Sequence, residues 1–213
     1  MYIVFIICSA LSGLINSEYL NLYISKVVII DISKNRKGGR NMFNQYPIGK
    51  FTMKENIQKD DIQAWISDIG AAPKQLVDAV EGLTKEQLAT PYREGGWKLS
   101  QVVHHLADSH VNSYIRFKVG LTEQEPIIKP YDEVAWATLV DNDLPIEVSL
   151  QLFSALHERL HKLLCSLNER DLKRVVQHPE NGQLTIEQLI ATYAWHGKHH
   201  IAHITTLRNQ KGW

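Results

Sequence analysis

Histidine is concentrated in two short stretches of this chain of 213 residues. Four of the ten histidines lie in YAWHGKHHIAHI, residues 193–204, and three more lie in HHLADSH, residues 104–110. Imidazole is the commonest metal ligand among side chains, and two histidines four residues apart on a helix lie on one face, close enough to share an ion. Both stretches are therefore candidates for supplying ligands to a metal site.

The C-terminal stretch contains two overlapping pairs with this spacing. His196 and His200 form one pair, and His199 and His203 form a second pair that is rotated by about 60° around the helix. A third ligand has to come from a facing helix, and the other stretch offers three candidates: His104, His105 and His110. Spacing alone chooses neither between the two pairs nor among the three partners.

Three neutral histidines with an open coordination position suit Zn²⁺ or Ni²⁺, and such a site lowers the pKa of a bound water toward about 7. The pair has the spacing of the H-E-x-x-H motif of zinc proteases, but Gly197 stands where such a protease has its glutamate base. A protease of that kind is therefore disfavoured. The chain has two cysteines, so we expect no thiolate site, and we expect Cys165 to be a buried core thiol.

The elements that must position these histidines are long helices. Hydrophobic residues at helical spacing predict four of them, beginning near residues 59, 98, 146 and 185. In the first, we expect Gly70 to end the helix and Pro73 to begin another. A capping box formed by Thr185 and Gln188 starts the last helix, which we expect to continue to about Arg208.

The connections complete the predicted fold. The stretch EPIIKPYDEVAW, residues 125–136, is bounded by prolines and reads as a long crossover. Asn181-Gly182 lies between two short extended runs and predicts a small hairpin. We therefore predict an all-α protein, a four-helix bundle with a long crossover connection and a small hairpin before the last helix.

Charge and composition narrow the function classes. Lys plus Arg and Asp plus Glu both number 23, so the net charge gives no sign of nucleic-acid binding. A hydrophobic fraction of 44% with 22% charged residues is ordinary for a globular protein, and we expect no membrane partner. Residues 42–213 are long enough for one domain with a full core.

Residues 1–41 differ from the rest of the chain. The apolar run from Tyr2 to Ile15 is short and interrupted for a membrane span, and no basic residue precedes it, unlike in a signal peptide. The stretch KGGRNM, residues 37–42, can be encoded by a ribosome-binding sequence at its usual distance from an ATG codon. We therefore favour Met42 as the true start and residues 1–41 as a mistranslated leader. The alternatives are a signal-like or anchoring segment and a genuine extension.

Several motifs resemble the DinB/YfiT-like superfamily, most closely its YfiT-type branch of metal-dependent hydrolases, which includes bacillithiol transferases. The resemblance covers residues 44–213 and rests mainly on GGWKLSQVVHHLADSH and HGKHHIAHI. It also includes YPIGKF, TPYREGGW, NSYIRFK and KPYDE, which follow in the order and spacing of the family. The segment before Met42 has no counterpart in that pattern.

The resemblance implies a choice that the spacing left open. In the family, the metal ligands are a histidine directly before leucine on the second bundle helix and the two histidines of an H-x-x-x-H on the last helix. These positions match His105, His196 and His200. The implied site is mononuclear, with one divalent ion per subunit, Zn²⁺ first and Ni²⁺ as the alternative. The resemblance also implies a homodimer located in the cytoplasm.

Other polar residues are candidates for lining the pocket. We expect Asp108, one turn after His105, either to orient an imidazole or to take a proton from bound water, with a solvated carboxylate as the alternative. His199 and His203 are expected to support the ligands or line the pocket, and His104 and His110 to pack in the bundle or at the pocket rim. Three further residues are candidates for lining the pocket and holding an anionic group, with anchoring of a bundle end as the alternative: Arg93, Trp97 and Arg116. His157 and His161 also have the pair spacing, but we expect no metal there.

Two enzymatic functions fit such a site. The first is a metal-dependent hydrolase in which bound water attacks a small-molecule substrate. The second is a thiol S-transferase in which the metal binds bacillithiol or a similar low-molecular-weight thiol and activates it against electrophiles. A non-enzymatic metal or pH sensor is a third hypothesis.

Overall fold

The computed structural model describes residues 45–179 and 182–213. The chain divides into two units after Met42, and the described residues belong to the second. The expectation that residues 1–41 are a leader or a signal-like segment lies outside the described residues. It stays a prediction, as does the assignment of residues 42–213 to one domain.

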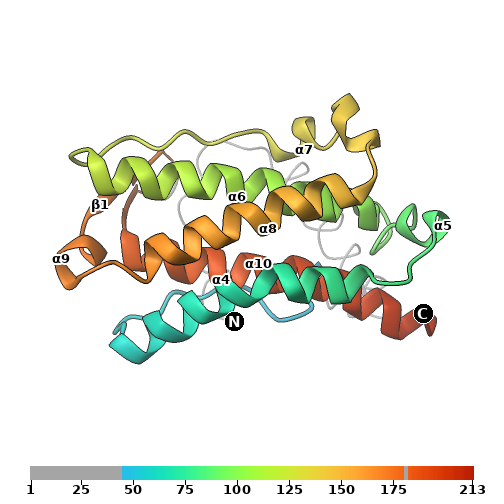
Figure 1. Ribbon diagram of the computed structural model, residues 1–213, viewed down its shortest axis with the longest axis horizontal. Coiled ribbons are helices and arrows are strands. Elements are labelled where there is room, and N and C mark those ends of the chain that lie inside the picture. The colour runs from blue at the N-terminus through green and yellow to red at the C-terminus, as the bar shows by residue number, and fades with distance from the viewer. Residues whose placement is uncertain (1–44, 180–181) are drawn as a thin grey trace, which may run out of the picture. The chain divides into compact units, whose positions relative to one another are not determined.

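Four long helices make the fold, and the predicted all-α bundle is confirmed (Figure 1). They are α4 (Lys59–Val80), α6 (Leu99–Thr122), α8 (Ile146–Leu164) and α10 (Ile186–Lys211). Each begins within a residue or two of its predicted start. Helix α10 packs against α4 and α6, and α8 packs against the same two helices, so the four close into a ring.

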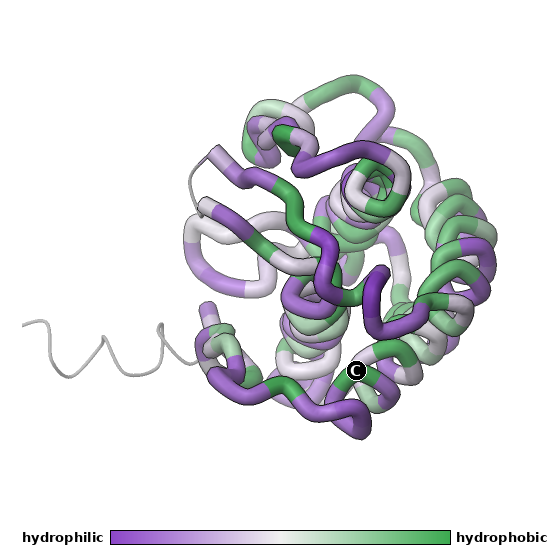
Figure 2. Tube along the Cα trace, turned by 90° about the vertical axis from the view of Figure 1, so that its left-hand side faces the viewer, coloured by the Kyte–Doolittle hydropathy of each residue, from purple (hydrophilic) through white to green (hydrophobic). Residues whose placement is uncertain are grey.

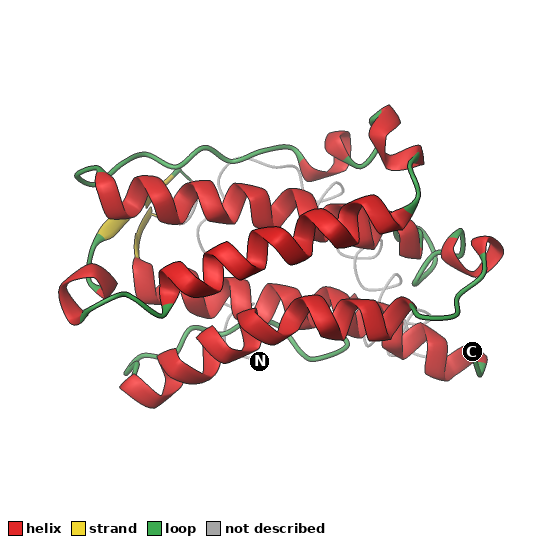
Figure 3. Cartoon of the chain, in the orientation of Figure 1, coloured by secondary structure: helices red, strands yellow, loops and turns green. Residues whose placement is uncertain are grey.

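The helix directions explain the long connection. In Figure 1, α4 and α10 run from left to right, whereas α6 and α8 both run from right to left. Because α6 and α8 are parallel, the chain has to return along the whole bundle between them. The crossover contains the short helix α7 (Glu133–Trp136) and the 3₁₀-helix η1 (Val140–Asp143), neither of which was predicted (Figure 3).

The predicted break in the first helix is wrong. Helix α4 continues through Gly70 and Pro73, with the proline inside it. A proline has no N–H, so the carbonyl of Ile69, four residues earlier, loses its helical donor. That carbonyl accepts a hydrogen bond from Nδ1 of His157 on α8 instead, at 2.7 Å. A side-chain donor from a neighbouring helix therefore replaces the missing backbone bond.

The predicted capping box at the start of the last helix and the predicted hairpin are confirmed. Thr185 caps α10 and Gln188 completes the capping box; Thr84 caps the short helix α5 (Lys85–Leu88) in the same way. Helix α9 (Glu169–Leu172) leads to strands β1 (Val175–His178) and β2 (Gly182–Thr185), which pair antiparallel and lie where α6 ends and α10 begins (Figure 3). Asn181, in the predicted turn, lies outside the described residues.

Two apolar clusters fill the bundle, one toward each end. One cluster includes Leu76, Leu99, Leu106, Phe153 and Ile204. The other includes Ile69, Phe117, Leu160, Val176 and Ile190. Figure 2 shows the mixture of hydrophobic and hydrophilic residues along each helix tube. On their respective helices, His110, His157 and His196 each lie between a residue of one cluster and a residue of the other, so a buried polar layer separates the two.

Cys165 is exposed directly after the end of α8, so the expectation of a buried thiol is wrong. Its Sγ lies 3.6 Å from Nε2 of His161, one turn earlier on the helix. No helix within the described ranges combines the length and apolarity that a membrane span needs.

Gly120 offers a test of how tightly the hairpin packs on the bundle. A Cβ atom at this position would lie 2.8 Å from Val176 and 2.9 Å from Ile186, both fully buried. Overpacking lowers the free energy of unfolding by about 1–3 kcal/mol, whereas the better helix propensity of alanine raises it by about 1 kcal/mol. We therefore expect Gly120→Ala to lower the free energy of unfolding in urea titrations. Lys118→Ala, exposed on the same helix, is the control, and an equally stable Gly120→Ala protein would contradict the packing.

Candidate metal centre

Three histidines converge between α6 and α10. His105 projects from α6, and His196 and His200 project from consecutive turns of the antiparallel α10. One ring nitrogen from each lies within 4.8 Å of the other two. Nε2 of His105 and Nε2 of His196 are 3.3 Å apart, and the ring of His200 lies 4.6 Å and 4.5 Å from the other two ring centroids. The structure thus brings together the three histidines that the resemblance selected.

The donor set fits a divalent metal ion. Nitrogen atoms bound to one tetrahedral Zn²⁺ at about 2.0–2.1 Å lie about 3.3 Å from each other. The observed separation of the two Nε2 atoms has this value. Nδ1 of His200 is buried and has no hydrogen-bond partner within the described part of the chain. Three imidazoles suit Zn²⁺ and Ni²⁺ better than the hard cations Mg²⁺ and Ca²⁺, which prefer oxygen ligands.

The environment keeps these rings neutral and able to act as ligands. Burial, followed by the neighbouring His203, lowers the pKa of His105 to about 4. Burial also holds the pKa values of His196 and His200 well below the ordinary 6.5, and the surrounding histidines lower them further. A neutral imidazole offers a lone pair to a metal, whereas a protonated one offers none.

Trp97 and Ser109 border the three histidines directly. The Trp97 ring lies 4.6 Å from the His105 ring and is stacked 6.3 Å from that of His200. Trp97 was predicted as a pocket residue, and its indole covers two of the three imidazoles. Ser109 was not predicted; its Oγ lies 3.5 Å from Nε2 of His196. Its position one turn after His105 on α6 is the only signal that the sequence offered.

Arg116 supplies a positive charge near the site. Its guanidinium donates to the Tyr193 hydroxyl at 2.6 Å and to the Lys129 carbonyl at 3.0 Å. Its charge is among the causes that lower the pKa of His196, after burial and the nearby histidines. Burial is the main cause that raises the pKa of the Tyr131 hydroxyl to about 12, and Ser109 and Tyr193 are close enough to shift it as well. Neither tyrosine was predicted from the sequence.

Asp108 is half-buried, and the pKa of its carboxyl is raised. Burial, and then the charge of Asp141, raises the pKa of its carboxyl to about 6. In the described ranges its carboxylate makes no recorded hydrogen bond to a site histidine; the recorded bond is from Asn112 to its backbone carbonyl. Within those ranges, Asp108 therefore has no hydrogen bond that would orient an imidazole as predicted. Its raised pKa, however, suits a role in proton transfer.

The second histidine pair of α10 is engaged elsewhere. His203 stacks on Tyr92 at 4.0 Å and donates from Nε2 to the Gln45 carbonyl at 3.1 Å. His199 stacks on Trp195 at 4.4 Å. Arg93, a predicted anion-binding residue, donates to the Tyr92 hydroxyl and to the Glu94 carbonyl. These side chains form a layer on the N-terminal residues 45–46 and the 90–97 loop, beside the three converging histidines.

His104 and His110 occupy different surroundings, although both are buried in α6. Nδ1 of His104 lies 2.8 Å from the Ser149 hydroxyl on α8. Nε2 of His110 lies 3.2 Å from Nδ1 of His196, and Nδ1 of His110 lies 2.9 Å from Nε2 of His157. His157, at which no metal was expected, is linked to the candidate centre through His110.

Comparison with known proteins identifies the family of this chain. Residues 69–204 match the family model of the DinB superfamily. The chain belongs to the DinB superfamily. It is 51% identical over 169 residues to a Bacillus cereus protein named "Putative metal-dependent hydrolase", with 79% of this chain and 98% of that protein covered. A relative with the same designation from Oceanobacillus iheyensis is 51% identical over 172 residues, with 81% of this chain and 100% of the relative covered.

A solved structure supports the fold assignment. YfiT from Bacillus subtilis matches with a TM-score of 0.77 and 47% identity, over 80% of this chain and 99% of that chain. It is described as a probable metal-dependent hydrolase with an unusual four-helix bundle topology.

The buried histidines predict an acid-sensitive fold. The unfolded chain takes up protons on these rings below about pH 6.5, whereas burial keeps His105 and His157 neutral in the folded protein down to about pH 4. The free energy of unfolding of the metal-free protein should therefore fall as the pH is lowered from 7 toward 4.5. Asp108 acts in the opposite direction, but it is one half-buried carboxyl against several buried rings.

Urea titrations at pH 7.5, 6 and 5 measure this dependence. His157→Gln removes one of the titrating rings and should show a shallower loss of stability with falling pH. A wild-type protein that is equally stable at pH 7.5 and pH 5 would contradict the neutral state of the rings.

Proposed function

We propose that this protein is a metal-dependent hydrolase that holds one divalent cation with His105, His196 and His200. The observation that carries the proposal is the convergence of three imidazoles, one buried and two partly buried, with one ring nitrogen of each within 4.8 Å of the others and two Nε2 atoms at 3.3 Å. The names of the Bacillus and Oceanobacillus relatives support the same reaction class. We propose Zn²⁺ as the ion, with Ni²⁺ as the alternative, because both accept three imidazole ligands.

A divalent cation in an open three-histidine site lowers the pKa of a water molecule or thiol in its open position, which supplies a nucleophile at neutral pH. The surrounding residues suit the remaining tasks. The Asp108 carboxyl, with a pKa of about 6, is mostly ionised at pH 7 and can accept a proton. The guanidinium of Arg116 suits an anionic group of a small-molecule substrate. The Trp97 indole shields His105 and His200 from water on one side.

A thiol S-transferase is the second candidate. The Asp108 carboxylate has no recorded hydrogen bond to the three histidines within the part of the chain described. A hydrolase gains from a base near the attacking water, whereas a thiol bound as thiolate needs no separate base once it is deprotonated. The positive charge of Arg116 also suits a carboxylate-bearing thiol such as bacillithiol. A homodimer and a cytoplasmic location remain predictions from the family resemblance.

Metal stoichiometry tests the ligand assignment. We expect His105→Ala, His196→Ala and His200→Ala each to abolish stoichiometric Zn²⁺ binding in inductively coupled plasma measurements after dialysis, because two imidazoles hold zinc weakly. His199→Ala is the matched control on α10, with its ring stacked on Trp195, and should retain one ion per chain. If both His105→Ala and His200→Ala bind one ion, the assignment is wrong.

Substrate conversion separates the two reactions. The metal-loaded protein is mixed with a panel of esters and amides, and with a model electrophile, each with and without bacillithiol. For a hydrolase, we expect loss of an ester or amide without the thiol. Conjugation of the electrophile that requires the thiol would instead support the transferase. His200→Ala is the control in both arms, and any conversion that persists in it does not arise at the proposed site.

A further inference from the structure

A row of buried histidines leads away from the proposed centre through the bundle. Nε2 of His110 lies 3.2 Å from Nδ1 of His196, and Nδ1 of His110 lies 2.9 Å from Nε2 of His157. Nδ1 of His157 lies 2.7 Å from the carbonyl oxygen of Ile69. The row begins on α10, crosses α6 and α8, and ends on the backbone of α4.

The end of the row determines where each proton lies. A carbonyl oxygen can only accept, so Nδ1 of His157 must carry a proton and donate it to Ile69. In a neutral ring, Nε2 of His157 then has the lone pair and accepts from Nδ1 of His110. By the same reasoning, Nε2 of His110 accepts from Nδ1 of His196. His196 is left with its lone pair on Nε2, the atom that lies 3.3 Å from His105.

The packing supports neutral rings along the whole row. His110 is fully buried and His157 is 1% exposed. Burial holds the pKa of His110 well below its ordinary value and lowers that of His157 to about 4. The recorded hydrogen bonds of these rings join them to one another and to a backbone carbonyl, and none in the described ranges joins either ring to a carboxylate.

Pro73 makes the anchoring carbonyl available. In an uninterrupted helix, the N–H of residue 73 would donate to the Ile69 carbonyl. Proline lacks that N–H, so in α4 the carbonyl lacks its helical donor and meets the His157 side chain. A buried carbonyl without a donor is costly, so this arrangement ties the proline and the histidine to each other.

We propose that His110 and His157 are positioning residues that hold His196 as the tautomer with its proton on Nδ1 and its lone pair on Nε2, directed at the metal centre. The expected effect on metal binding rests on the proposed function, because the lone pair on Nε2 matters for metal affinity only when His196 is a ligand. Histidine ligands commonly donate their second ring N–H to a carboxylate, a backbone carbonyl or water. Here the acceptor for His196 is His110, and the backbone carbonyl of Ile69 is reached only through His157.

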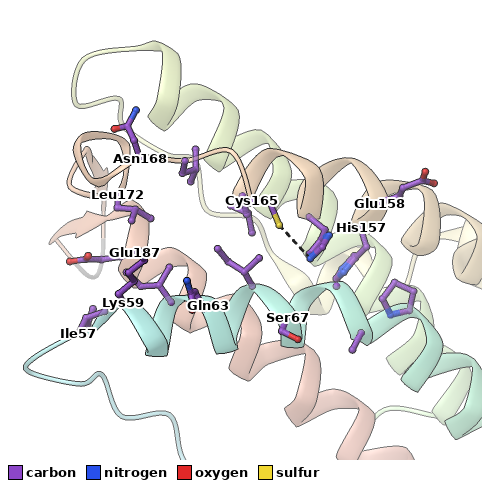
Figure 4. Close-up of a pocket in the computed structure, with 18 of the residues that line it drawn as sticks. Ile57, Lys59, Gln63, Ser67, His157, Glu158, Cys165, Asn168, Leu172 and Glu187 are labelled. Atoms are coloured by element: carbon purple, nitrogen blue, oxygen red, sulfur yellow. Dashed lines mark hydrogen bonds between the residues drawn. The ribbon is translucent and has the colours of Figure 1, made fainter.

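The far end of the row borders a large groove between α4 and α8. The groove has a volume of about 1580 Å³ and is lined by His157, Gly70, Ser67 and Cys165, among others. Figure 4 shows His157 on α8 at the wall of this groove, opposite α4. A change at His157 therefore reaches His196 through His110.

Nitrogen NMR of the metal-free protein tests the proposal, because it separates protonated from unprotonated ring nitrogens. In the wild type, we expect His196 to be protonated on Nδ1 alone. His157→Phe keeps a ring of similar size but removes the acceptor for His110, so we expect a mixture of His196 tautomers. The dissociation constant for Zn²⁺ should rise by about 10–100-fold. His157→Gln can donate to Ile69 and accept from His110, and should restore the single tautomer.

His104→Phe is the matched control, because His104 is also buried and lies between α6 and α8, but its Nδ1 lies against the Ser149 hydroxyl instead of the row. It should leave the His196 tautomer and the Zn²⁺ affinity unchanged. Protonation of His196 on Nε2 in the wild type overturns the proposal, even if His157→Phe does not fold. A folded His157→Phe protein with the His196 tautomer unchanged overturns it as well. Failure of the wild type to bind metal would refute the proposed function while the tautomer result stands.

Discussion

The constraint on which this structure depends is the burial of a polar layer between two apolar clusters. Three imidazole rings lie at the junction of these clusters, those of His110, His157 and His196, and the rings of His105 and His200 lie against that of His196. Rings taken out of water remain neutral, and their polar atoms need partners. The row from His196 to the Ile69 carbonyl satisfies one part of the layer. We propose that a metal ion satisfies the other part, at His105, His196 and His200.

The architecture follows from this requirement. Helices α6 and α10 are antiparallel neighbours, which places His105 opposite the two turns that carry His196 and His200. Helix α8 supplies His157, and α4 supplies the carbonyl freed by Pro73. Each of the four helices thus contributes to the layer. The hairpin and the packing around Gly120 close the bundle at the end away from Trp97, where α10 begins.

Periodicity and capping in the sequence predict the helices well, because an amphipathic stripe and a box such as Thr185 with Gln188 act locally. Gly70 and Pro73 mislead for the same reason. Their local preference is to break a helix, and a hydrogen bond from α8, remote in sequence, compensates for it. Spacing also reduced the histidines of α10 to two pairs, but choosing between pairs needs the facing helix. The family resemblance supplied that choice, whereas the link from His110 to His157 depends on packing that no spacing encodes.

Anomalous diffraction from crystals of the zinc-loaded protein, with data collected on both sides of the zinc absorption edge, tests the central claim most directly. We expect one anomalous peak per chain, within bonding distance of His105, His196 and His200, with Nε2 of His196 facing the peak and its Nδ1 facing His110. A peak on His199 and His203, or on Nδ1 of His196, would contradict it.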